Sequence, residues 1–530
     1  MSGSSGVASL SALNNWPGTV AQFQQRLVFG GSYQNPSGIW LTQPGNYYNM
    51  NVSVPVRDSD AITQTITAPP PGAGVQVNEI SSLVPMPSGL LVFTSGGAWQ
   101  ISGGQPGAAV TPAAIQATAQ AFSGASPNVQ PIPVGYQVLY CAVNGATVRD
   151  LSYNFYANVY TGNDLSALAD HLFFGRTIVD WCWAEEPWKL LWAVRDDGVL
   201  LSMTYLKEQN LFAWAHHETR GQVESVASVV EDGQSRVYMV VKRFLGGDWT
   251  RCVERLALRD FGANPAQDIP PDPALAWCVD CGLSYPRPLP AATLSPAAST
   301  GSGVAFLADA DVFGVGDVGK VIRAGGGRAT VTAYVSPREL TADITADIAA
   351  VIPGDPDGRP IPAGAGFWSL TTPTASVSGL GHLEGLEVAV LADGNAGTAT
   401  VSAGTVALER AATNIIVGLP FTWEVGTLPV NVPGQPTMRG RRKMANSVTV
   451  LMQDSRGIEI GPNLDTMTPM PDRPAQGVAN AGATPLVSGE IRTNITSDWT
   501  PYGQIWLRGT TPLPATVLGV AGEWVLGDTG

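Results

Sequence analysis

The sequence predicts an all-β protein: a β-propeller followed by additional β-sandwich or barrel-like domains. Three observations favour this class. Glycine (60 residues) and proline (41) are frequent, as in chains with many tight turns. Short runs rich in Val, Thr and aromatic residues recur and stop at glycine-containing turns, which is typical of strands. Only 14% of the residues are charged and aromatic residues are plentiful, so the composition is that of a folded rather than a disordered chain.

The first half of the chain carries a weak repeat of strand pairs. A second apolar segment follows each of its apolar runs, and the units recur about every 45–65 residues. Strand pairs at that period are typical of propeller blades, although a series of hairpins could also form a sandwich. We therefore expect propeller-like blades over residues 1–285. The apolar runs are Arg26–Gly31, Leu90–Gly97, Val138–Gly145, Leu190–Gly198 and Val237–Gly247.

The fourth unit shows the expected blade most clearly. Its pattern predicts strands at Trp188–Val194, Val199–Leu206 and Leu211–Glu218, with turns at Asp196–Gly198 and Lys207–Asn210. Asp-Gly between apolar runs is a strong hairpin signal, because a type I′ turn needs positive φ at both central residues.

One segment of the first half competes with the strand pattern. Thr111–Gly124 begins with Thr before Pro and ends in Gly, which would also suit a helix. The sequence leaves this segment open.

The composition changes after residue 285. Pro286–Val304 has the content of a linker. Asp317–Ser336 then predicts a hairpin that turns at Gly325–Gly327, and a Pro/Gly-rich passage follows at Ile352–Gly366. We expect an inserted small β domain with Pro/Gly-rich linkers over residues 286–375.

Further strands are expected in a C-terminal β platform domain over residues 376–530. Leu386–Leu408 alternates strongly and contains a Gly-rich turn at Asp393–Gly397. Asn446–Asp454 predicts another strand, and two more are expected near the end of the chain.

Charge and cysteine content exclude several classes of protein. The net charge of −14 disfavours a tight nucleic-acid binder, but not a surface past which DNA slides. Five scattered cysteines do not form a disulfide framework, so we expect a reducing folding compartment. The N-terminus lacks the pattern of a signal peptide, and no apolar run is long enough to cross a membrane.

Three pairs of residues could carry chemistry. Asp196 and Asp197 are adjacent at an expected turn, whereas a catalytic pair must approach one substrate from separate positions. Cys278 and Cys281 form a CxxC without further ligands nearby in sequence, so we expect small apolar side chains rather than a zinc site. His216 and His217 alternate on an expected strand and cannot bind one metal together.

No catalytic motif is visible in the sequence. Gly379–Gly385 comes nearest to a dinucleotide-binding loop, but its last spacing is one residue too long and it precedes a strand. We predict no catalytic residue, metal site or cofactor, and hence no enzyme. The one basic cluster is a possible DNA or subunit contact; it consists of Arg439, Arg441, Arg442 and Lys443.

Several long phrases of the sequence resemble a known family. Trp16–Asn51, Asp58–Ile62, Val148–Phe173 and the stretch from Pro187 to Thr219 follow one another in that family's order. Shorter phrases in the C-terminal half continue it, among them "GLGHLEGLEVAVLADG", "TVSAGTVAL" and "IIVGLPFTWEVGTLPV". These phrases are similar to the tail nozzle proteins of short-tailed bacteriophages, also called tail tubular protein B-like or phage stabilisation proteins.

The resemblance implies a structural virion protein. It implies a homo-oligomer, expected to be a hexamer, that forms the DNA exit channel of the tail below the portal and the head–tail adaptor ring. Tail fibre or spike proteins are further implied partners, and phage DNA passes without sequence-specific binding. The implied location is the virion tail, after synthesis in the cytoplasm of the host bacterium.

Two departures from the family pattern affect this reading. Only about twenty residues precede the RLVFGG segment, fewer than in many members, so a propeller must close differently or use a separate chain. Cys281 also stands where Ser is usual. The alternative is a carbohydrate-binding or carbohydrate-cleaving β-propeller, whose 15 Trp could stack on sugar rings.

Overall fold

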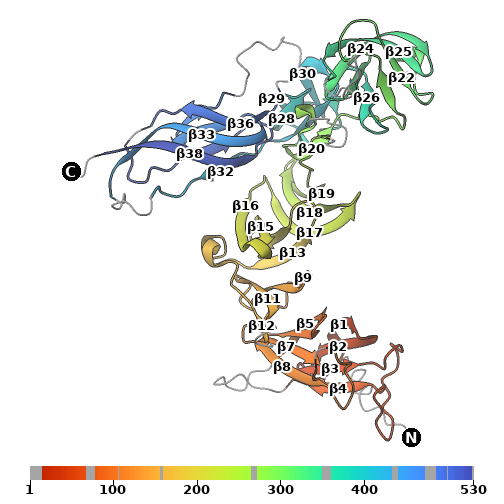
Figure 1. Cartoon of the computed structure of the whole chain (residues 1–530), viewed down its shortest axis with the longest axis vertical. Helices are drawn as coiled ribbons and strands as arrows, with labels where there is room; N and C mark the ends of the chain where they lie inside the picture. Colours follow the sequence, from red (N-terminus) through yellow and green to blue (C-terminus); the bar gives the residue numbers. More distant parts are fainter. Residues whose placement is uncertain are drawn as a thin grey trace. The chain divides into compact units, whose positions relative to one another are not determined.

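The computed structural model describes residues 15–66, 78–105, 107–154, 159–263, 271–348, 360–431, 440–471, 485–497 and 499–527. These residues form strands with a few short 3-10 turns, which confirms the all-β class. The chain divides into two units, drawn in the colours of the sequence in Figure 1. The first comprises Met1–Lys242 and Arg251–Leu256, and the second comprises Arg243–Thr250 and Ala257–Gly530.

Five sheets follow one another along the first part of the chain. Within each sheet, neighbouring strands are consecutive in sequence, which is the meander of a propeller blade. The strands of the first two sheets are β1 (Pro17–Phe23), β2 (Arg26–Ser32), β3 (Gly38–Leu41) and β4 (Ile62–Thr65), then β5 (Ile80–Met86), β6 (Gly89–Thr94), β7 (Ala98–Ser102) and β8 (Gln116–Ala121).

The next three sheets keep the same order. The third and fourth contain β9 (Ile132–Val134), β10 (Gln137–Cys141), β11 (Val148–Asn154) and β12 (Val159–Thr161), then β13 (Ile178–Ala184), β14 (Leu190–Arg195), β15 (Leu200–Leu206) and β16 (Leu211–His217). The fifth contains β17 (Gln222–Glu231), β18 (Gln234–Leu245) and β19 (Asp248–Arg255). Two 3-10 turns accompany them, η2 (Ala167–Leu172) and η3 (Lys207–Gln209).

Alternation along the strands packs each sheet between its neighbours. On β6, Leu90 and Val92 belong to a hydrophobic cluster shared with the first sheet. Leu91 and Phe93 belong to a different cluster, shared with the third sheet. Successive side chains of a strand point to opposite faces, so a strand buried on both faces is apolar throughout.

Hydrophobic clusters connect each of the five sheets to the next. Separate clusters join the first to the second, the second to the third, the third to the fourth, and the fourth to the fifth. Burial of apolar surface at each boundary supplies the main stabilisation of such a series. Among the clusters formed by described residues, none joins the first sheet to the fifth.

A buried carboxylate adds a polar connection between the third and fourth sheets. Asp150 on β11 is fully buried, and its side chain accepts hydrogen bonds from Lys207 Nζ at 2.5 Å and Tyr205 Oη at 3.3 Å. The backbone N–H of Asn163 donates to the other carboxylate oxygen at 2.6 Å. A buried charge is tolerated when it is paired and hydrogen-bonded in this way.

The second unit contains a six-stranded sheet that has its own hydrophobic core. It contains β21 (Leu294–Pro296), β22 (Val304–Ala308), β23 (Val321–Ala324), β24 (Gly327–Ser336), β25 (Glu339–Ala346) and β26 (Trp368–Thr371), with the turn η6 (Val315–Asp317). The hairpin expected around Gly325–Gly327 is present, with Ala324 paired to Gly327 and positive φ at Gly325 and Gly326.

Apart from the strand β20, the remaining sheets of the second unit come from residues that follow Thr371. One sheet has the order β20 (Asp280–Ser284), β31 (Ile415–Leu419), β28 (Glu387–Ala392) and β29 (Asn395–Thr400), and β27 (Thr374–Ser378) pairs with β30 (Thr405–Ala412). Short 3-10 turns are η5 (Pro273–Leu275) and η7 (Gly381–Leu383).

Two further sheets share one hydrophobic core, to which Val448, Ile460 and Leu507 contribute. One has the order β32 (Trp423–Gly426), β37 (Trp506–Gly509), β34 (Glu459–Asn463) and β35 (Thr466–Pro469). The other has the order β36 (Val487–Asn494), β33 (Lys443–Ser455) and β38 (Val517–Leu526). Two sheets around a shared core form a sandwich-like layer pair.

The structure differs from the expected organisation at two places. The first domain was expected to continue to residue 285, but β20 pairs with β31 and the second unit already includes Ala257–Gly530. Thr111–Gly124, which could have been helical, contains β8, paired with β7. Cross-strand pairing there outweighs the local helix signals at its ends.

The described residues contain no helix that is long and apolar enough to cross a membrane.

Candidate functional site

The paired acids of the fourth sheet lie at a hairpin tip, as the sequence predicts. Asp196 and Asp197 form the turn between β14 and β15, and the N–H of Gly198 donates to the carbonyl of Arg195 at 3.0 Å. Only Gly198 has positive φ (85°). The turn is therefore a three-residue loop with a left-handed glycine, not the expected type I′ turn.

Arginines neutralise both acids of this turn. Arg195 donates to Asp197 at 2.5 and 3.0 Å, and Arg176 lies 3.3 Å from Asp197 and 3.9 Å from Asp196. The hydrogen bonds from Arg195 are the main reason that the pKa of Asp197 lies below its ordinary value. A general acid at neutral pH would need a raised pKa. The contact between Arg195 and Asp197 therefore stabilises the turn.

The two neighbouring histidines have different partners. His216 approaches Glu218 at 3.6 Å, whereas Nε2 of His217 lies 2.7 Å from the hydroxyl of Ser202. Part of the His217 side chain reaches solvent, but its ring packs on Trp192 at 5.0 Å.

Burial of this ring, and secondarily the charge of His216, lowers the pKa of His217 to about 4. Among the described residues no carboxylate hydrogen-bonds to His217, so the Ser–His pair lacks the orienting acid of a nucleophilic triad.

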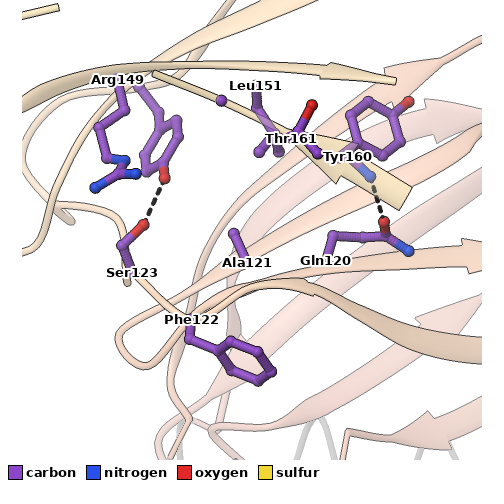
Figure 2. A pocket seen from close by; sticks show the side chains of 10 residues that line it. Gln120, Ala121, Phe122, Ser123, Arg149, Leu151, Tyr160 and Thr161 are labelled. Atoms are coloured by element: carbon purple, nitrogen blue, oxygen red, sulfur yellow. Dashed lines mark hydrogen bonds between the residues drawn. The ribbon is translucent and has the colours of Figure 1, made fainter. Parts of the chain in front are cut away.

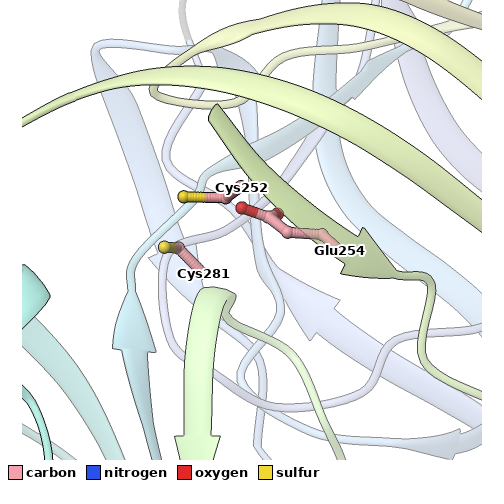
Figure 3. A group of neighbouring side chains, drawn as sticks. All are labelled: Cys252, Glu254 and Cys281. Carbon is pink, nitrogen blue, oxygen red and sulfur yellow. The ribbon is translucent and has the colours of Figure 1, made fainter. Parts of the chain in front are cut away.

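The cysteines of the CxxC do not form a disulfide, and burial raises the pKa of Cys278 to about 11. A thiol with a raised pKa carries little thiolate at neutral pH and is a poor nucleophile. Cys281 lies on β20, while Cys252 and Glu254 lie two positions apart on β19 and leave the same face of that strand (Figure 3).

The basic cluster is only partly available for contacts. Lys443 is 2% exposed, and its ammonium donates to the carbonyls of Pro501 at 2.9 Å and Arg441 at 3.3 Å. The side chain of Arg441 donates to the carbonyl of Gly527 at 3.2 Å, and Arg442 is exposed. Lys443 therefore does not fit the expected surface contact, because its charge serves the C-terminal fold. Arg439 lies outside the described residues.

A groove lies between the second and third sheets of the first unit. It consists of two adjoining pockets of about 510 and 400 Å³, which share Phe122, Ser123 and Arg149. Phe122 and Ser123 follow the edge strand β8, whereas Arg149 lies on β11. Figure 2 shows Arg149 and Phe122 on either side of Ser123.

Hydrogen bonds fix the polar side chains of this groove. Ser123 Oγ and Tyr140 Oη are 2.6 Å apart, and Arg149 lies opposite Tyr140 where β10 pairs with β11. The N–H of Tyr160 donates to Gln120 Oε1 at 2.7 Å (Figure 2). Burial raises the pKa of Tyr140, so its hydroxyl stays protonated at neutral pH and can donate.

The sequence did not indicate this groove. Its residues come from two sheets, and no short motif connects Phe122 with Arg149. The strand Val148–Asn154 mixes apolar and polar residues, so Arg149 did not stand out in it.

No family model and no curated protein matches this chain. A putative 6-phosphogluconolactonase from Bacteroides uniformis is 11% identical, with a TM-score of 0.24, over 54% of this chain and 79% of that chain.

Two other solved structures are similarly distant. A luciferin-regenerating enzyme is 10% identical, with a TM-score of 0.19, over 41% of this chain and 80% of that chain. A protein from Lactobacillus plantarum is 10% identical, with a TM-score of 0.24, over 74% of this chain and 99% of that chain. None of these likenesses carries an argument about activity.

Proposed function

We propose that this chain is a structural subunit of the tail nozzle of a short-tailed bacteriophage, and not an enzyme. One observation carries the proposal: phrases that resemble the nozzle family fall, in the family's order, on the first, third and fourth sheets of the first unit. Trp16–Asn51 spans β1–β3, Val148–Phe173 spans β11 and β12, and Pro187–Thr219 spans β14–β16. The resemblance therefore covers part of three of the five sheets, and this supports the proposal.

The charges of the chain are compatible with this role. A net charge of −14 repels the DNA backbone, whereas a basic channel would bind the duplex through many phosphate contacts and retain it. Among the described residues of the basic cluster, Arg442 is the one whose exposure suits a phosphate or subunit contact. Identical subunits that contact head to tail close into a ring, and the family resemblance favours six.

The chemistry of the described residues adds indirect support. The Asp196–Asp197 turn is neutralised by arginines, and the Ser202–His217 pair has no acid among the described residues. A sugar-cleaving propeller would need two carboxylates at one pocket, and no carboxylate lines the groove beside Arg149. The cleaving form of the alternative is therefore disfavoured, whereas a binding form is compatible with the groove.

Labelling of intact particles tests the proposal. Antibodies against the purified chain should label the tail of the phage that encodes it, and the chain should remain with the tail when heads are removed. A chain that is absent from purified particles, or that is found only in the lysate, would contradict a structural tail role.

A further inference from the structure

The groove beside Arg149 has a charge unlike that of the chain as a whole. Arg149 is the one charged side chain among its lining residues, in a protein of net charge −14. Among the described residues Arg149 forms no ion pair with a carboxylate. The carboxylate of the adjacent Asp150 is bonded to Lys207, Tyr205 and Asn163. A guanidinium without a carboxylate partner is suited to bind one from a ligand.

The hydrogen-bond directions leave donors facing the groove. The hydroxyls of Ser123 and Tyr140 form one hydrogen bond in which either can donate, so this contact uses one of their two protons. This leaves one hydroxyl proton of the pair and the guanidinium N–H groups of Arg149 for a ligand. Gln120, Asn144 and Thr161 add further polar groups along the lining.

An exposed aromatic ring completes the groove. Phe122 is 66% exposed although it lines both pockets. An exposed ring beside hydroxyl and amide groups is the usual arrangement for stacking on the apolar face of a sugar. The combined volume lies in the range of pockets that hold small ligands, which suits one or two sugar rings.

We propose that this groove binds an acidic saccharide, with the carboxylate of a uronic or sialic acid on Arg149 and a sugar ring on Phe122. The inference does not depend on the tail role, because it rests only on the groove between the second and third sheets. An acidic peptide shares the carboxylate but has fewer hydroxyl groups to satisfy Ser123 and the amides. A blocked aspartyl-glycine dipeptide is therefore titrated alongside the oligosaccharides.

Direct binding measurements test the proposal. The full-length protein is titrated, by saturation-transfer NMR and calorimetry, with oligosaccharides containing glucuronate, galacturonate or sialate and with their neutral counterparts of equal size. We expect saturable binding of at least one acidic oligosaccharide, at least about tenfold tighter than its neutral counterpart, as for a charge-assisted hydrogen bond. Added salt should reduce this preference.

Four variants assign the binding to the groove. Arg149→Gln should remove the preference for the acidic oligosaccharide, and Phe122→Ala should weaken acidic and neutral oligosaccharides alike. The matched controls Arg338→Gln and Phe174→Ala change exposed residues outside the groove and should bind as the wild type does. All four should keep the wild-type circular dichroism spectrum.

Three results would overturn the proposal. One is the absence of saturable binding by every acidic oligosaccharide. Another is a preference that survives in Arg149→Gln. The third is tighter binding of a blocked aspartyl-glycine dipeptide than of any oligosaccharide, which would make the groove a peptide site.

Discussion

Arg149 and Asp150 are neighbours on β11, but they face opposite sides of the third sheet. Asp150 faces the fourth sheet, where it is buried and bonded to Lys207, Tyr205 and Asn163. Arg149 faces the groove with the second sheet, where no described carboxylate lies against it. The Asp150 face therefore resembles a structural connection, because its charges are satisfied internally. The Arg149 face retains unused hydrogen-bonding capacity, which suits a binding surface.

The largest expected effect is on the Asp150 side. Asp150→Asn removes the charge that pairs with Lys207 and leaves a partly buried ammonium without its partner. We expect the free energy of unfolding to fall by about 3 kcal/mol, at the low end for a broken buried pair because Lys207 keeps some solvent. Urea unfolding followed by fluorescence measures this change.

Asp232→Asn, at the exposed tip of the β17–β18 hairpin, is the matched control and should change stability little. A loss below about 0.5 kcal/mol in Asp150→Asn would show that Asp150 does not stabilise the contact between the third and fourth sheets.

A substitution at Gly162 should affect both faces of β11. A Cβ at this position would lie 1.7 Å from the carbonyl oxygen of Asp150, and Gly162 also lines the groove. Gly162→Ala must displace backbone, and we expect a loss of about 2 kcal/mol together with weaker saccharide binding.

Gly316→Ala, whose Cβ would meet no atom within 4 Å, provides the control in the same unfolding assay. Unchanged stability in Gly162→Ala would contradict the close approach of Gly162 to the carbonyl oxygen of Asp150.

The contact between Asp197 and Arg195 resembles the Asp150 contact, but it contributes less to stability and its contribution depends on pH. Asp197→Asn should cost about 1 kcal/mol at pH 7, because the Asp197 side chain is only 20% exposed and pairs with Arg195. The folded pKa of Asp197 is lowered chiefly by Arg195, so its contribution is complete above the ordinary carboxyl pKa of about 4. The contribution is lost as the pH falls through the lower, folded pKa.

Asp196→Asn is the matched control for this turn, since Asp196 is more exposed and its nearest cation is 3.9 Å away. Unfolding curves between about pH 7 and pH 2 should show the difference between Asp197→Asn and wild type shrinking with acidity. Equal effects of the two substitutions at pH 7 would contradict the assigned contact.

The smallest expected effect on stability is at Arg149. Arg149→Gln should change the free energy of unfolding by less than about 0.5 kcal/mol, because no described ion pair is broken. Thermal unfolding without ligand measures this, alongside the binding titration. A loss as large as that of Asp150→Asn would mean that Arg149, like Asp150, belongs to a structural contact and not to a binding surface.

Local features of the fold could be predicted from the sequence, whereas contacts between distant residues could not. The hairpins at Asp196–Gly198 and Gly325–Gly327 are determined by residues within the turns, so their positions were evident. The predicted turn type at Gly198 was wrong. A strand register that differs by one residue selects a three-residue loop instead of the two-residue type I′ turn. Lys443 seemed to be a surface cation, yet carbonyls from residues 441 and 501 bind it. The groove depends on the pairing of β10 with β11 and on the end of β8, which no short stretch encodes.

The proposed role as a ring-forming tail subunit is tested most directly by an image of the isolated protein. Negative-stain electron microscopy of the purified full-length chain should show rings with a central hole, with six subunits favoured by the family resemblance. A uniform population of single subunits, at concentrations where tail proteins assemble, would contradict the account.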